Sequence, residues 1–273
     1  MSPAERAGDP VNGGMGTADK GMGTHQRVAL VTGAARGLGL AIAQRLGRQG
    51  HPVVLVDADP VVDERAGELR DSGFEARAIR LDVADEAAVR ALPQRLGDWY
   101  DSLAILVNNA GVSPKLDGKK RPVRQMPVEE WRRVLDINLT GAFLVTQACL
   151  PALCARGWGR IVMITSQAAR TRTPVPGAHY AASKAGLGAF ARVLAAEVAA
   201  HGVTVNCVAP GRIESDMTAA IDSSINAALA AAIPIGRLGR PDEVASTVAF
   251  LVTEEASYLT GATVDVNGCS FMA

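Results

Sequence analysis

From Arg27 onward, apolar and polar positions alternate between two kinds of segment. Short runs of β-branched residues and leucine have the pattern of strands, and the longer stretches between them, with apolar residues every three or four positions, have the pattern of helices. Strands are predicted at Val28–Val31, Val53–Val56, Ala76–Arg80, Ala104–Val107, Ile161–Ile164, Val203–Val208 and Thr263–Val266. Helices are predicted near Leu38–Arg48, Val61–Ser72, Glu86–Leu96, Val128–Cys154, Ala181–Ala200 and Asp242–Thr253.

Most of the predicted strands are continuous apolar runs, which is typical of strands buried on both faces of a parallel sheet. Strands that alternate with helices imply right-handed crossovers and helices on both faces. The expected fold class is therefore α/β, a single-domain Rossmann-type doubly wound parallel sheet of about seven strands. Nothing between residues 27 and 273 resembles a linker, so this stretch is predicted to be one domain.

Two segments fall outside the regular pattern. Residues 1–26 are rich in glycine, alanine and small polar residues, and Gly-Met-Gly-Thr occurs twice, so we expect a disordered N-terminal tail rather than a secretory signal. Ser215–Ile233 is alanine-rich and helical in pattern. It is either a lid over a site or a pair of surface helices.

Charge and cysteine content exclude several classes of protein. Lys plus Arg and Asp plus Glu are equal at 28 each, and this zero formal charge argues against nucleic acid as a partner. No apolar run approaches the roughly 20 residues of a membrane helix. The cysteines, Cys149, Cys154, Cys207 and Cys269, show no C-x-x-C spacing, and the four histidines are scattered. We therefore expect no metal site, no disulfide framework and a cytoplasmic location.

A glycine-rich turn follows the first predicted strand. Thr32-Gly33-Ala34-Ala35-Arg36-Gly37-Leu38-Gly39 runs directly into a helix. Glycines let the backbone approach a pyrophosphate, and the helix N-terminus offers free N–H groups. The spacing G-x-x-x-G-x-G differs from the commonest dinucleotide fingerprint, but its position between strand and helix favours a dinucleotide site at Gly33, Arg36, Gly37, Leu38 and Gly39.

Asp57 ends the second predicted strand, about 20 residues after the glycine turn. A carboxylate there accepts hydrogen bonds from an adenosine ribose and repels a 2′-phosphate, so it favours NAD over NADP. Arg36 points the other way, because a guanidinium in the turn suits a 2′-phosphate. We judge Asp57 the stronger signal, since desolvating it against a phosphate is costly.

The next two strands also end in polar residues. Asp82 and Val83 follow the third strand, and Asn108-Asn109-Ala110-Gly111 follows the fourth. Ligands of open α/β sheets bind at these carboxyl ends. We expect Asp82, Val83, Asn109, Ala110 and Gly111 to contact the cofactor.

Tyr180 and Lys184 stand four residues apart, so they share a face of a helix. A nearby ammonium favours the phenolate and lowers the pKa of tyrosine from its usual value near 10, which suits general acid/base catalysis. Ser166 follows the fifth strand and can hydrogen-bond a substrate oxygen as charge develops on it.

Taken together, these motifs resemble the short-chain dehydrogenase/reductase family over about residues 27–272. The resemblance is carried by the glycine turn, Asn108–Gly111, Asn138, Ser166, Tyr180-Ala181-Ala182-Ser183-Lys184, Pro210-Gly211, Arg240–Glu243 and Tyr258–Gly261. It implies a catalytic tetrad of Asn138, Ser166, Tyr180 and Lys184.

The resemblance assigns further roles. Lys184 would hold the nicotinamide ribose, and Asn138 would position a water linked to that lysine. Pro210, Gly211, Ile213 and the hydroxyl of Ser215 would meet the nicotinamide carboxamide. The Ser166–Tyr180 spacing is about one residue longer than is usual, which leaves Thr165 as the alternative to Ser166, although Thr165 should point the other way. The family also implies a homotetramer.

Basic residues gather in two loops of the predicted site. Lys115, Lys119, Lys120, Arg121 and Arg124 follow the fourth strand, and Arg170 and Arg172 lie between Ser166 and Tyr180. Arg170 or Arg172 could pair with a substrate carboxylate or phosphate. The alternative is ordinary solvated loop charge.

The sequence therefore predicts an oxidoreductase that moves a hydride between NAD(H) and a small secondary alcohol or ketone, such as a sugar, polyol or hydroxy acid. An NADPH-dependent 3-oxoacyl-thioester reductase is the alternative, because Val266-Asn267-Gly268 followed by Phe271-Met272 resembles that subgroup. A non-catalytic nucleotide sensor is disfavoured by the complete tetrad. A sugar-nucleotide epimerase or dehydratase is disfavoured by the glycine spacing and the short C-terminal region.

Overall fold

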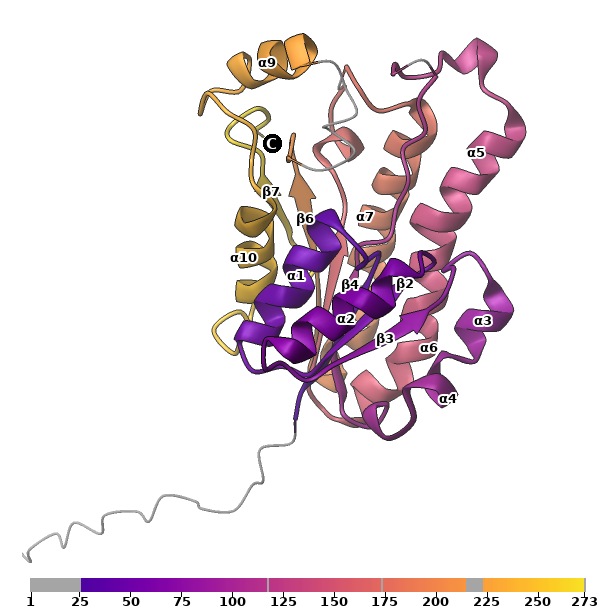
Figure 1. Ribbon diagram of the computed structural model, residues 1–273, viewed down its shortest axis with the longest axis vertical. Coiled ribbons are helices and arrows are strands. Elements are labelled where there is room, and N and C mark those ends of the chain that lie inside the picture. The colour runs from indigo at the N-terminus through magenta and orange to yellow at the C-terminus, as the bar shows by residue number, and fades with distance from the viewer. Residues whose placement is uncertain (1–25, 117, 173, 215–222, 273) are drawn as a thin grey trace, which may run out of the picture.

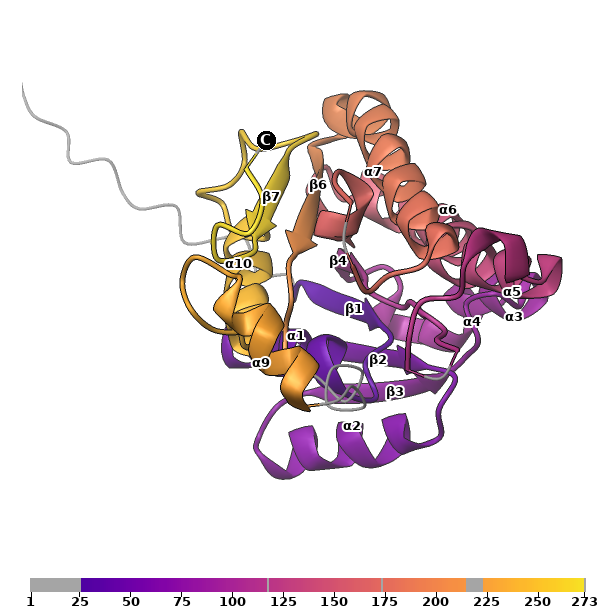
Figure 2. The ribbon, with the colours of Figure 1, turned by 90° about the horizontal axis from the view of Figure 1, so that it is seen from above.

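The computed structural model describes residues 26–116, 118–172, 174–214 and 223–272. Residues 1–25 of the predicted tail and residues 215–222 of the predicted insertion lie outside the described residues. The rest of the chain forms one α/β domain with a central sheet covered by helices on both faces (Figures 1 and 2).

All seven described strands run parallel, in the order β3-β2-β1-β4-β5-β6-β7. They are β1 (Val28–Thr32), β2 (Val53–Asp57), β3 (Ala76–Arg80), β4 (Leu103–Asn108), β5 (Gly159–Ile164), β6 (Val203–Pro210) and β7 (Thr263–Val266). The strand order reverses between β1 and β4. Ligands of doubly wound sheets bind at such a switch point, at the carboxyl ends of the strands.

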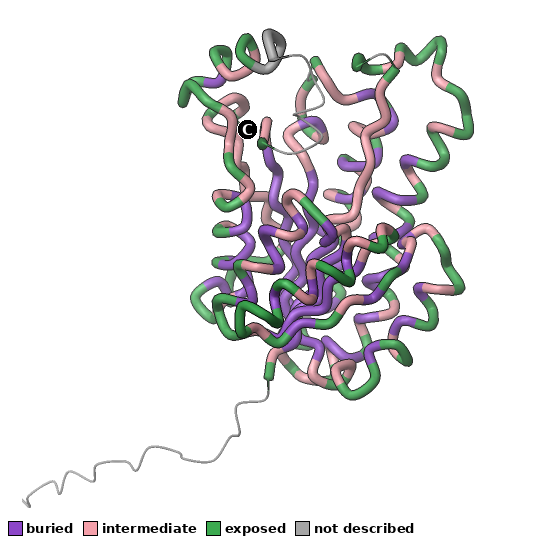
Figure 3. Tube along the Cα trace, viewed as in Figure 1, coloured by how far each residue is buried: buried purple, intermediate pink, exposed green. Residues whose placement is uncertain are grey.

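Alternate residues of the central strands face two separate hydrophobic cores. Val28 and Leu30 of β1 belong to one core, and Ala29 and Val31 to the other. The first core is closed by α3 (Glu86–Arg90), α4 (Leu92–Leu96), α6 (Gly141–Ala155) and α7 (Ala178–Val198). The second is closed by α1 (Gly37–Arg48), α2 (Val61–Asp71) and α10 (Pro241–Leu251). Figure 3 shows the strands buried between these layers, which explains their uninterrupted apolar sequences.

The predicted helix Val128–Cys154 is continuous but not uniformly α-helical. It consists of α5 (Val128–Leu135), a π-helical turn at Asp136–Thr140, and α6. The whole of Val128–Ala155 is long and apolar enough to cross a membrane by length and composition, with a mean hydropathy of 1.5 in its most apolar window. Half of that window is buried inside the domain, as expected of a core helix.

Other helix boundaries differ from the predictions for local reasons. The predicted helix Glu86–Leu96 is split into α3 and α4, because Pro93 has no N–H to continue the helical ladder. α7 begins at Ala178 rather than Ala181, which places Tyr180 in its first turn. Of the predicted insertion, α9 (Ser223–Ala231) is helical as expected and lies at the carboxyl ends of the strands in Figure 1.

Candidate active site

Two glycines of the glycine turn, Gly33 and Gly39, lie too close to neighbouring atoms to carry a side chain. Gly33 has φ +66°, and a Cβ there would lie 2.8 Å from Cα of Ala110. A Cβ on Gly39 would lie 2.0 Å from the carbonyl oxygen of Gly33. The turn therefore lies directly against the end of β4, and the N-terminus of α1 opens beside it. A pyrophosphate needs such close access to helical N–H groups.

Asn109 and Thr32 hold this arrangement in place. Asn109 donates from Nδ2 to the carbonyl oxygens of Thr32 and Gly33, at 2.9 and 3.0 Å. The hydroxyl of Thr32 accepts from the backbone N–H groups of Asn109 and Ala110, both at 3.0 Å. Asn109 is thus the brace that connects the ends of β1 and β4.

Asp57 lies at the end of β2, as predicted, and faces the glycine turn. One carboxylate oxygen accepts from the N–H of Ala35 at 2.9 Å, and the other accepts from the N–H of Asp59 at 3.0 Å. Each carboxylate oxygen has a second lone pair, which leaves room for ribose hydroxyls. Arg36 forms an ion pair with Asp59, a partner that the sequence analysis did not single out.

Asp82 and Val83, which follow β3, form a turn and a packing contact at the edge of the site. Asp82 accepts from the N–H of Ala84 at 3.0 Å, so its side chain shapes its own turn. Val83 is buried and presses on Gly141, where a Cβ would lie 2.7 Å from a Val83 methyl group. Both residues line the cavity described below.

Beyond β5, Ser166 rather than Thr165 faces the tyrosine. Thr165 donates its hydroxyl to the carbonyl of Val208 at 2.9 Å and is buried, as the strand alternation predicts. Ser166 caps a short 3₁₀ turn, accepting from the N–H of Ala168 at 3.1 Å, and it also hydrogen-bonds Tyr180. The longer loop before Tyr180 therefore does not displace the serine.

Tyr180 and Lys184 lie one turn apart on α7, with the Lys184 Nζ atom 5.8 Å from the centre of the tyrosine ring. Lys184 is buried and donates to the carbonyl of Ile164 at 2.7 Å. Burial lowers the pKa of Lys184 to about 8. Burial also raises the pKa of Tyr180, against the prediction of a lowered value, and the hydrogen bond with Ser166 opposes that rise. Desolvation of the buried phenol is the larger of these two effects.

Asn138 lies in the π-helical turn, completely buried behind the cavity wall. Its side chain accepts from the N–H of Val112 at 2.8 Å and donates to the carbonyl of Val112 and to the hydroxyl of Ser183. A Cβ on Gly111 would lie 3.3 Å from both Asn138 Oδ1 and Lys184 Nζ. Asn138 therefore fastens the loop after β4 to α7, beside the lysine. π-helical turns often occur at functional sites.

His179 completes the support of Tyr180 and was missed by the sequence analysis. Its Nδ1 accepts from the N–H of Tyr180 at 2.7 Å, so the ring hydrogen is on Nε2, which lies 3.1 Å from Glu130 of α5. Glu130 also pairs with Arg121 of the basic loop. The sequence shows that His179 precedes Tyr180, but its partner Glu130 lies 49 residues away, so this contact leaves no local pattern.

The end of β6 forms the remaining wall. Gly211 donates to the carbonyl of Val266 at 2.9 Å, and a Cβ there would lie 2.8 Å from Asn267. Pro210, Gly211 and Ile213 line the cavity as expected. Ser215, which the sequence analysis also assigned to the cofactor, lies outside the described residues.

These residues surround a cavity of about 510 Å³ at the carboxyl ends of the strands. From the predicted set it is lined by Gly33, Arg36, Gly37, Leu38, Gly39, Asp57, Asp82, Val83, Asn109, Ala110, Gly111, Ser166, Tyr180, Lys184, Pro210, Gly211 and Ile213. The glycine turn fits a pyrophosphate, Asp57 fits a ribose, and Tyr180 stands at the other end. Within the described ranges, no group of three or more His, Cys, Asp or Glu side chains could hold a metal ion.

The hypothesis that Arg170 or Arg172 binds the substrate is not supported. Arg170 forms an ion pair with Asp265 of β7 and lies over the ring of Phe271. Arg172 is exposed, and the described part of the cavity wall includes neither arginine. The cations that do line the described cavity are Arg36, Lys115, Arg133, Lys184 and Arg212.

Comparisons with known proteins show which family the chain belongs to. A family model described as enoyl-(acyl carrier protein) reductase matches residues 33–269. The cis-4-hydroxycyclohexanecarboxylate dehydrogenase of Sinomonas cyclohexanicum is 40% identical over 243 residues, which cover 89% of this chain and 96% of that protein. The chain belongs to the short-chain dehydrogenase/reductase family.

Other relatives in this family are named as reductases. The 3-oxoacyl-[acyl-carrier-protein] reductase of Aquifex aeolicus (strain VF5) is 39% identical over 250 residues, covering 90% of this chain and 97% of that protein. The crystal structure of a 3-oxoacyl-[acyl-carrier protein] reductase with bound NAD from Brucella melitensis superimposes with a TM-score of 0.85 and is 39% identical. The superposition covers 92% of this chain and 93% of the Brucella chain. As a short-chain dehydrogenase/reductase, the chain is an oxidoreductase that uses a nicotinamide cofactor and acts on CH–OH groups.

Proposed function

We propose that this chain is an NAD-dependent dehydrogenase of a small secondary alcohol, with Tyr180 as the acid/base. The observation that carries the proposal is the shared cavity, in which Asp57 faces the glycine turn at one end and Ser166, Tyr180 and Lys184 meet at the other. This arrangement offers a ribose acceptor and a proton acceptor in a single site.

Two carboxylates, those of Asp57 and Asp59, support NAD over NADP. Asp57 would accept the adenosine ribose hydroxyls and repel a 2′-phosphate. Arg36, the residue that would favour such a phosphate, is already paired with Asp59. The carboxylate of Asp59 therefore offsets the charge of Arg36, the residue of the glycine turn that opposed NAD. The Brucella relative with bound NAD is in keeping with this choice.

The chemistry divides among the proposed tetrad. Bound NAD would accept the hydride from the alcohol carbon. In the oxidation direction, the phenolate of Tyr180 takes the hydroxyl proton, and Ser166 donates a hydrogen bond to the same substrate oxygen. Lys184 lies beside the tyrosine, where its ammonium would hold the ribose hydroxyls and stabilise the phenolate. Asn138 fixes the loop against which Lys184 packs.

A 3-oxoacyl-thioester reductase that uses NADPH is the second candidate. The Aquifex relative bears that activity in its name, and the guanidinium of Arg36 in the glycine turn favours NADP. A non-catalytic nucleotide sensor of this fold is opposed by Ser166, Tyr180 and Lys184 standing together, because a sensor would not need to keep all three.

We extend the proposal to the organisation of the protein. Residues 27–273 form the dinucleotide-binding and catalytic unit, and four such chains assemble as a tetramer. The apolar side chains of α5, α6 and α7 that face outward, at Val128, Trp131, Phe143 and Val193, support self-association on that face.

A cytoplasmic location accords with the absence of disulfides among the four cysteines.

A panel of substrates with both cofactors tests the proposed function. Sugars, sugar acids, cyclic alcohols and β-keto thioesters are assayed separately with NAD(H) and NADP(H), and kcat/KM is measured for each pair. We expect a cyclic or polyhydroxy alcohol with NAD to give the highest value. A β-keto thioester with NADPH as the best pair would support the second candidate instead.

A further inference from the structure

Residues 267–272, which we call the C-terminal strap, follow β7 and form a fixed turn of their own. The side chain of Asn267 accepts from the N–H of Cys269 at 3.0 Å and donates to the carbonyl of Phe271 at 2.9 Å. Cys269 has φ +68°, the only positive value among the described residues other than glycine. A residue with a side chain keeps such a backbone only where its surroundings fix it. The strap therefore has a defined conformation rather than that of a loose chain end.

Two hydrogen bonds fasten the strap to the 3₁₀ turn Gln167–Ala169, which Ser166 caps. The hydroxyl of Ser270 donates to Gln167 Oε1 at 2.8 Å, and Gln167 Nε2 donates to the carbonyl of Ser270 at 3.3 Å. The carbonyl of Asn267 is a second acceptor for the same hydroxyl, also at 2.8 Å. Gln167 and Ser270 are both half-buried, so these hydrogen bonds are partly shielded from water.

A further contact holds the other end of the same turn. Arg170 forms an ion pair with Asp265 of β7, and its guanidinium lies 5.0 Å from the centre of the Phe271 ring. Gly211 at the end of β6 packs against the start of the strap, because a Cβ there would lie 2.8 Å from Asn267. The strap is thus seated against the cavity wall and holds the turn at both ends.

The Ser166 hydroxyl depends on the turn that the strap holds. Its Oγ atom accepts from the N–H of Ala168 inside the turn and also hydrogen-bonds Tyr180. The wall of the described cavity contains Ser166 but neither Gln167 nor Ser270. A shift of the turn would therefore change the direction of the Ser166 hydroxyl without removing any group of that wall.

We propose that Gln167 and Ser270 are positioning residues, through which the C-terminal strap orients the Ser166 hydroxyl toward the substrate oxygen. This inference rests on the proposed function, because that function assigns Ser166 to the substrate oxygen. A hydrogen-bond donor stabilises developing charge best when it is aimed at the reacting oxygen before the reaction begins. A misplacement of about 1 Å can cost about 10²-fold in rate. The end of the chain would thus control kcat without touching substrate or cofactor.

Ser270→Val and Ser270→Thr test the inference, because valine and threonine have nearly the same shape and differ in the hydroxyl. kcat is measured with the best substrate and cofactor of the panel above, beside the Kd for that cofactor. We expect Ser270→Val to lower kcat about tenfold and Ser270→Thr to stay within about twofold of wild type, with the Kd unchanged in both. Gln167→Met, which loses both hydrogen bonds, should match the valine variant. Met272→Ala, at an exposed residue of the strap, is the control and should keep the wild-type kcat.

The same substitution in a Ser166→Ala background shows whether the effect passes through Ser166. Independent residues have additive effects on a free energy, whereas residues that act through one another do not. We therefore expect Ser270→Val to lower kcat no further once Ser166 is alanine. Full additivity would overturn the inference, and so would a wild-type kcat in both Ser270→Val and Gln167→Met. A wild-type kcat in Ser166→Ala itself would instead contradict the role of Ser166 in the proposed function.

Hydrogen exchange gives a measurement that needs no turnover. The N–H groups of residues 168–171 donate to oxygens of Ser166 and Gln167, so the turn protects them. Deuterium uptake by a peptide that covers these residues should be at least about tenfold faster in Ser270→Val than in Ser270→Thr. Equal uptake in the two variants would overturn the inference. Absence of turnover with every substrate of the panel would contradict the proposed function, and hydrogen exchange would then decide on its own whether the strap holds the turn.

Discussion

At the scale of single residues, the proposed choice of NAD depends on three charges, those of Asp57 and Asp59 at the end of β2 and of Arg36 in the glycine turn. Asp57 faces the glycine turn through the N–H of Ala35, and Asp59 pairs with Arg36. An adenosine 2′-phosphate would have to approach both carboxylates and break the ion pair. A ribose with two free hydroxyls meets acceptors instead.

Removing these charges should therefore shift the enzyme toward NADP. Asp57→Asn keeps an acceptor for Ala35, and Asp59→Ala releases Arg36 for a phosphate. We expect the double variant to raise the NADP/NAD ratio of kcat/KM by about tenfold or more, equivalent to about 1.4 kcal/mol. Asp63→Ala removes a nearby exposed charge on α2 and should leave the ratio unchanged. An unchanged ratio in the double variant would show that Asp57 and Asp59 do not select the cofactor.

Local sequence predicted the residues whose roles depend on strand ends and helical spacing. Ser166, Tyr180 and Lys184 are examples, because a strand end and an i,i+4 pair are visible without a structure. The contacts of the basic loop residues were not predictable in this way. Arg170 is paired with Asp265, which lies 95 residues away, and Lys115, which resembled a solvated loop charge, donates to the carbonyl of Val175. The tertiary contacts that decide both cases leave no local pattern.

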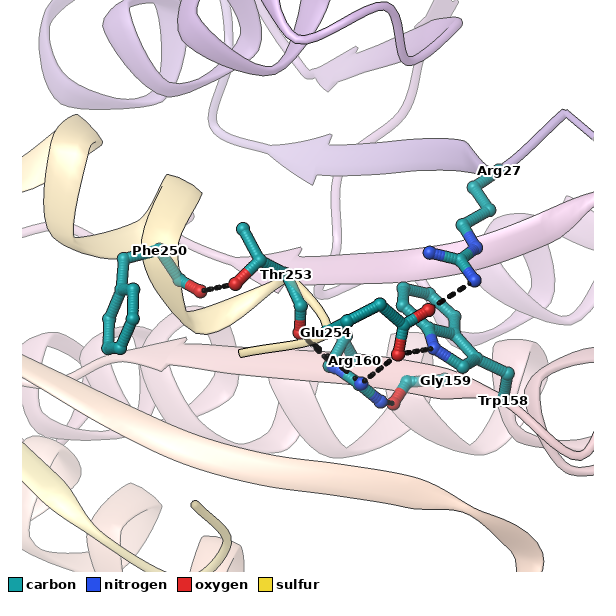
Figure 4. Close-up of polar contacts among 7 residues, drawn as sticks. All are labelled: Arg27, Trp158, Gly159, Arg160, Phe250, Thr253 and Glu254. Carbon is teal, nitrogen blue, oxygen red and sulfur yellow. Dashed lines mark hydrogen bonds and ion pairs between the residues drawn. The ribbon is translucent and has the colours of Figure 1, made fainter. Parts of the chain in front are cut away.

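At the scale of elements, a cluster of cations and aromatic rings closes the end of the sheet opposite the cavity (Figure 4). Arg160 of β5 is 2% exposed and donates to the carbonyls of Gly159 and Thr253. Trp158 lies between the guanidinium groups of Arg27 and Arg160. Glu254, just after α10, accepts from Arg27 at 2.6 Å and from the Trp158 indole at 3.1 Å. It lies 3.6 Å from Arg160.

Glu254→Gln should lower stability, because it removes the carboxylate that faces both guanidinium groups. The Glu254 side chain is 59% exposed, so we expect a loss of at most about 1 kcal/mol in the free energy of unfolding, measured by urea denaturation. Hydrogen bonding from Trp158, followed by Arg27, holds the pKa of Glu254 below its usual value.

The pH dependence of that loss gives a second check. A lowered pKa in the folded state stabilises the protein above the unfolded value near 4.3, and the benefit disappears as pH falls through the folded value. The difference between wild type and variant should thus be full at pH 7 and shrink below about pH 4. Glu197→Gln, the same change at an exposed position of α7, is the control. A wild-type level of stability for Glu254→Gln at pH 7 would contradict this role.

Apolar periodicity predicted the seven strands within about two residues, because buried strands leave uninterrupted apolar runs. It predicted the helices less exactly. The π-helical turn that holds Asn138 has nearly the same apolar spacing as an α-helix, so a sequence pattern does not distinguish them. The break at Pro93 was readable from its chemistry, since proline interrupts the ladder at a definite position.

At the scale of the whole molecule, one face of the helical layer exposes apolar side chains. Val193 of α7 is 60% exposed and Phe143 of α6 is 42% exposed, and Phe143 stacks edge-on against Phe190. We expect this face to join two subunits of the proposed tetramer. Phe143→Glu combined with Val193→Glu should reduce the mass measured by light scattering. Ala87→Glu adds charge to exposed helix α3 and should preserve the wild-type assembly. A tetramer that survives the double change would exclude this face.

In the proposed reaction the whole cavity acts on one substrate, because Tyr180 would exchange the proton while a bound nicotinamide would exchange the hydride. The most direct test is Tyr180→Phe, with turnover measured beside NADH binding by fluorescence titration. Loss of a general acid/base should lower kcat by about 10²–10⁴-fold, while the Kd for NADH stays within about twofold of wild type. Tyr258→Phe, at a fully exposed tyrosine, should retain normal turnover. A Tyr180→Phe enzyme with kcat near that of the wild type would contradict the account.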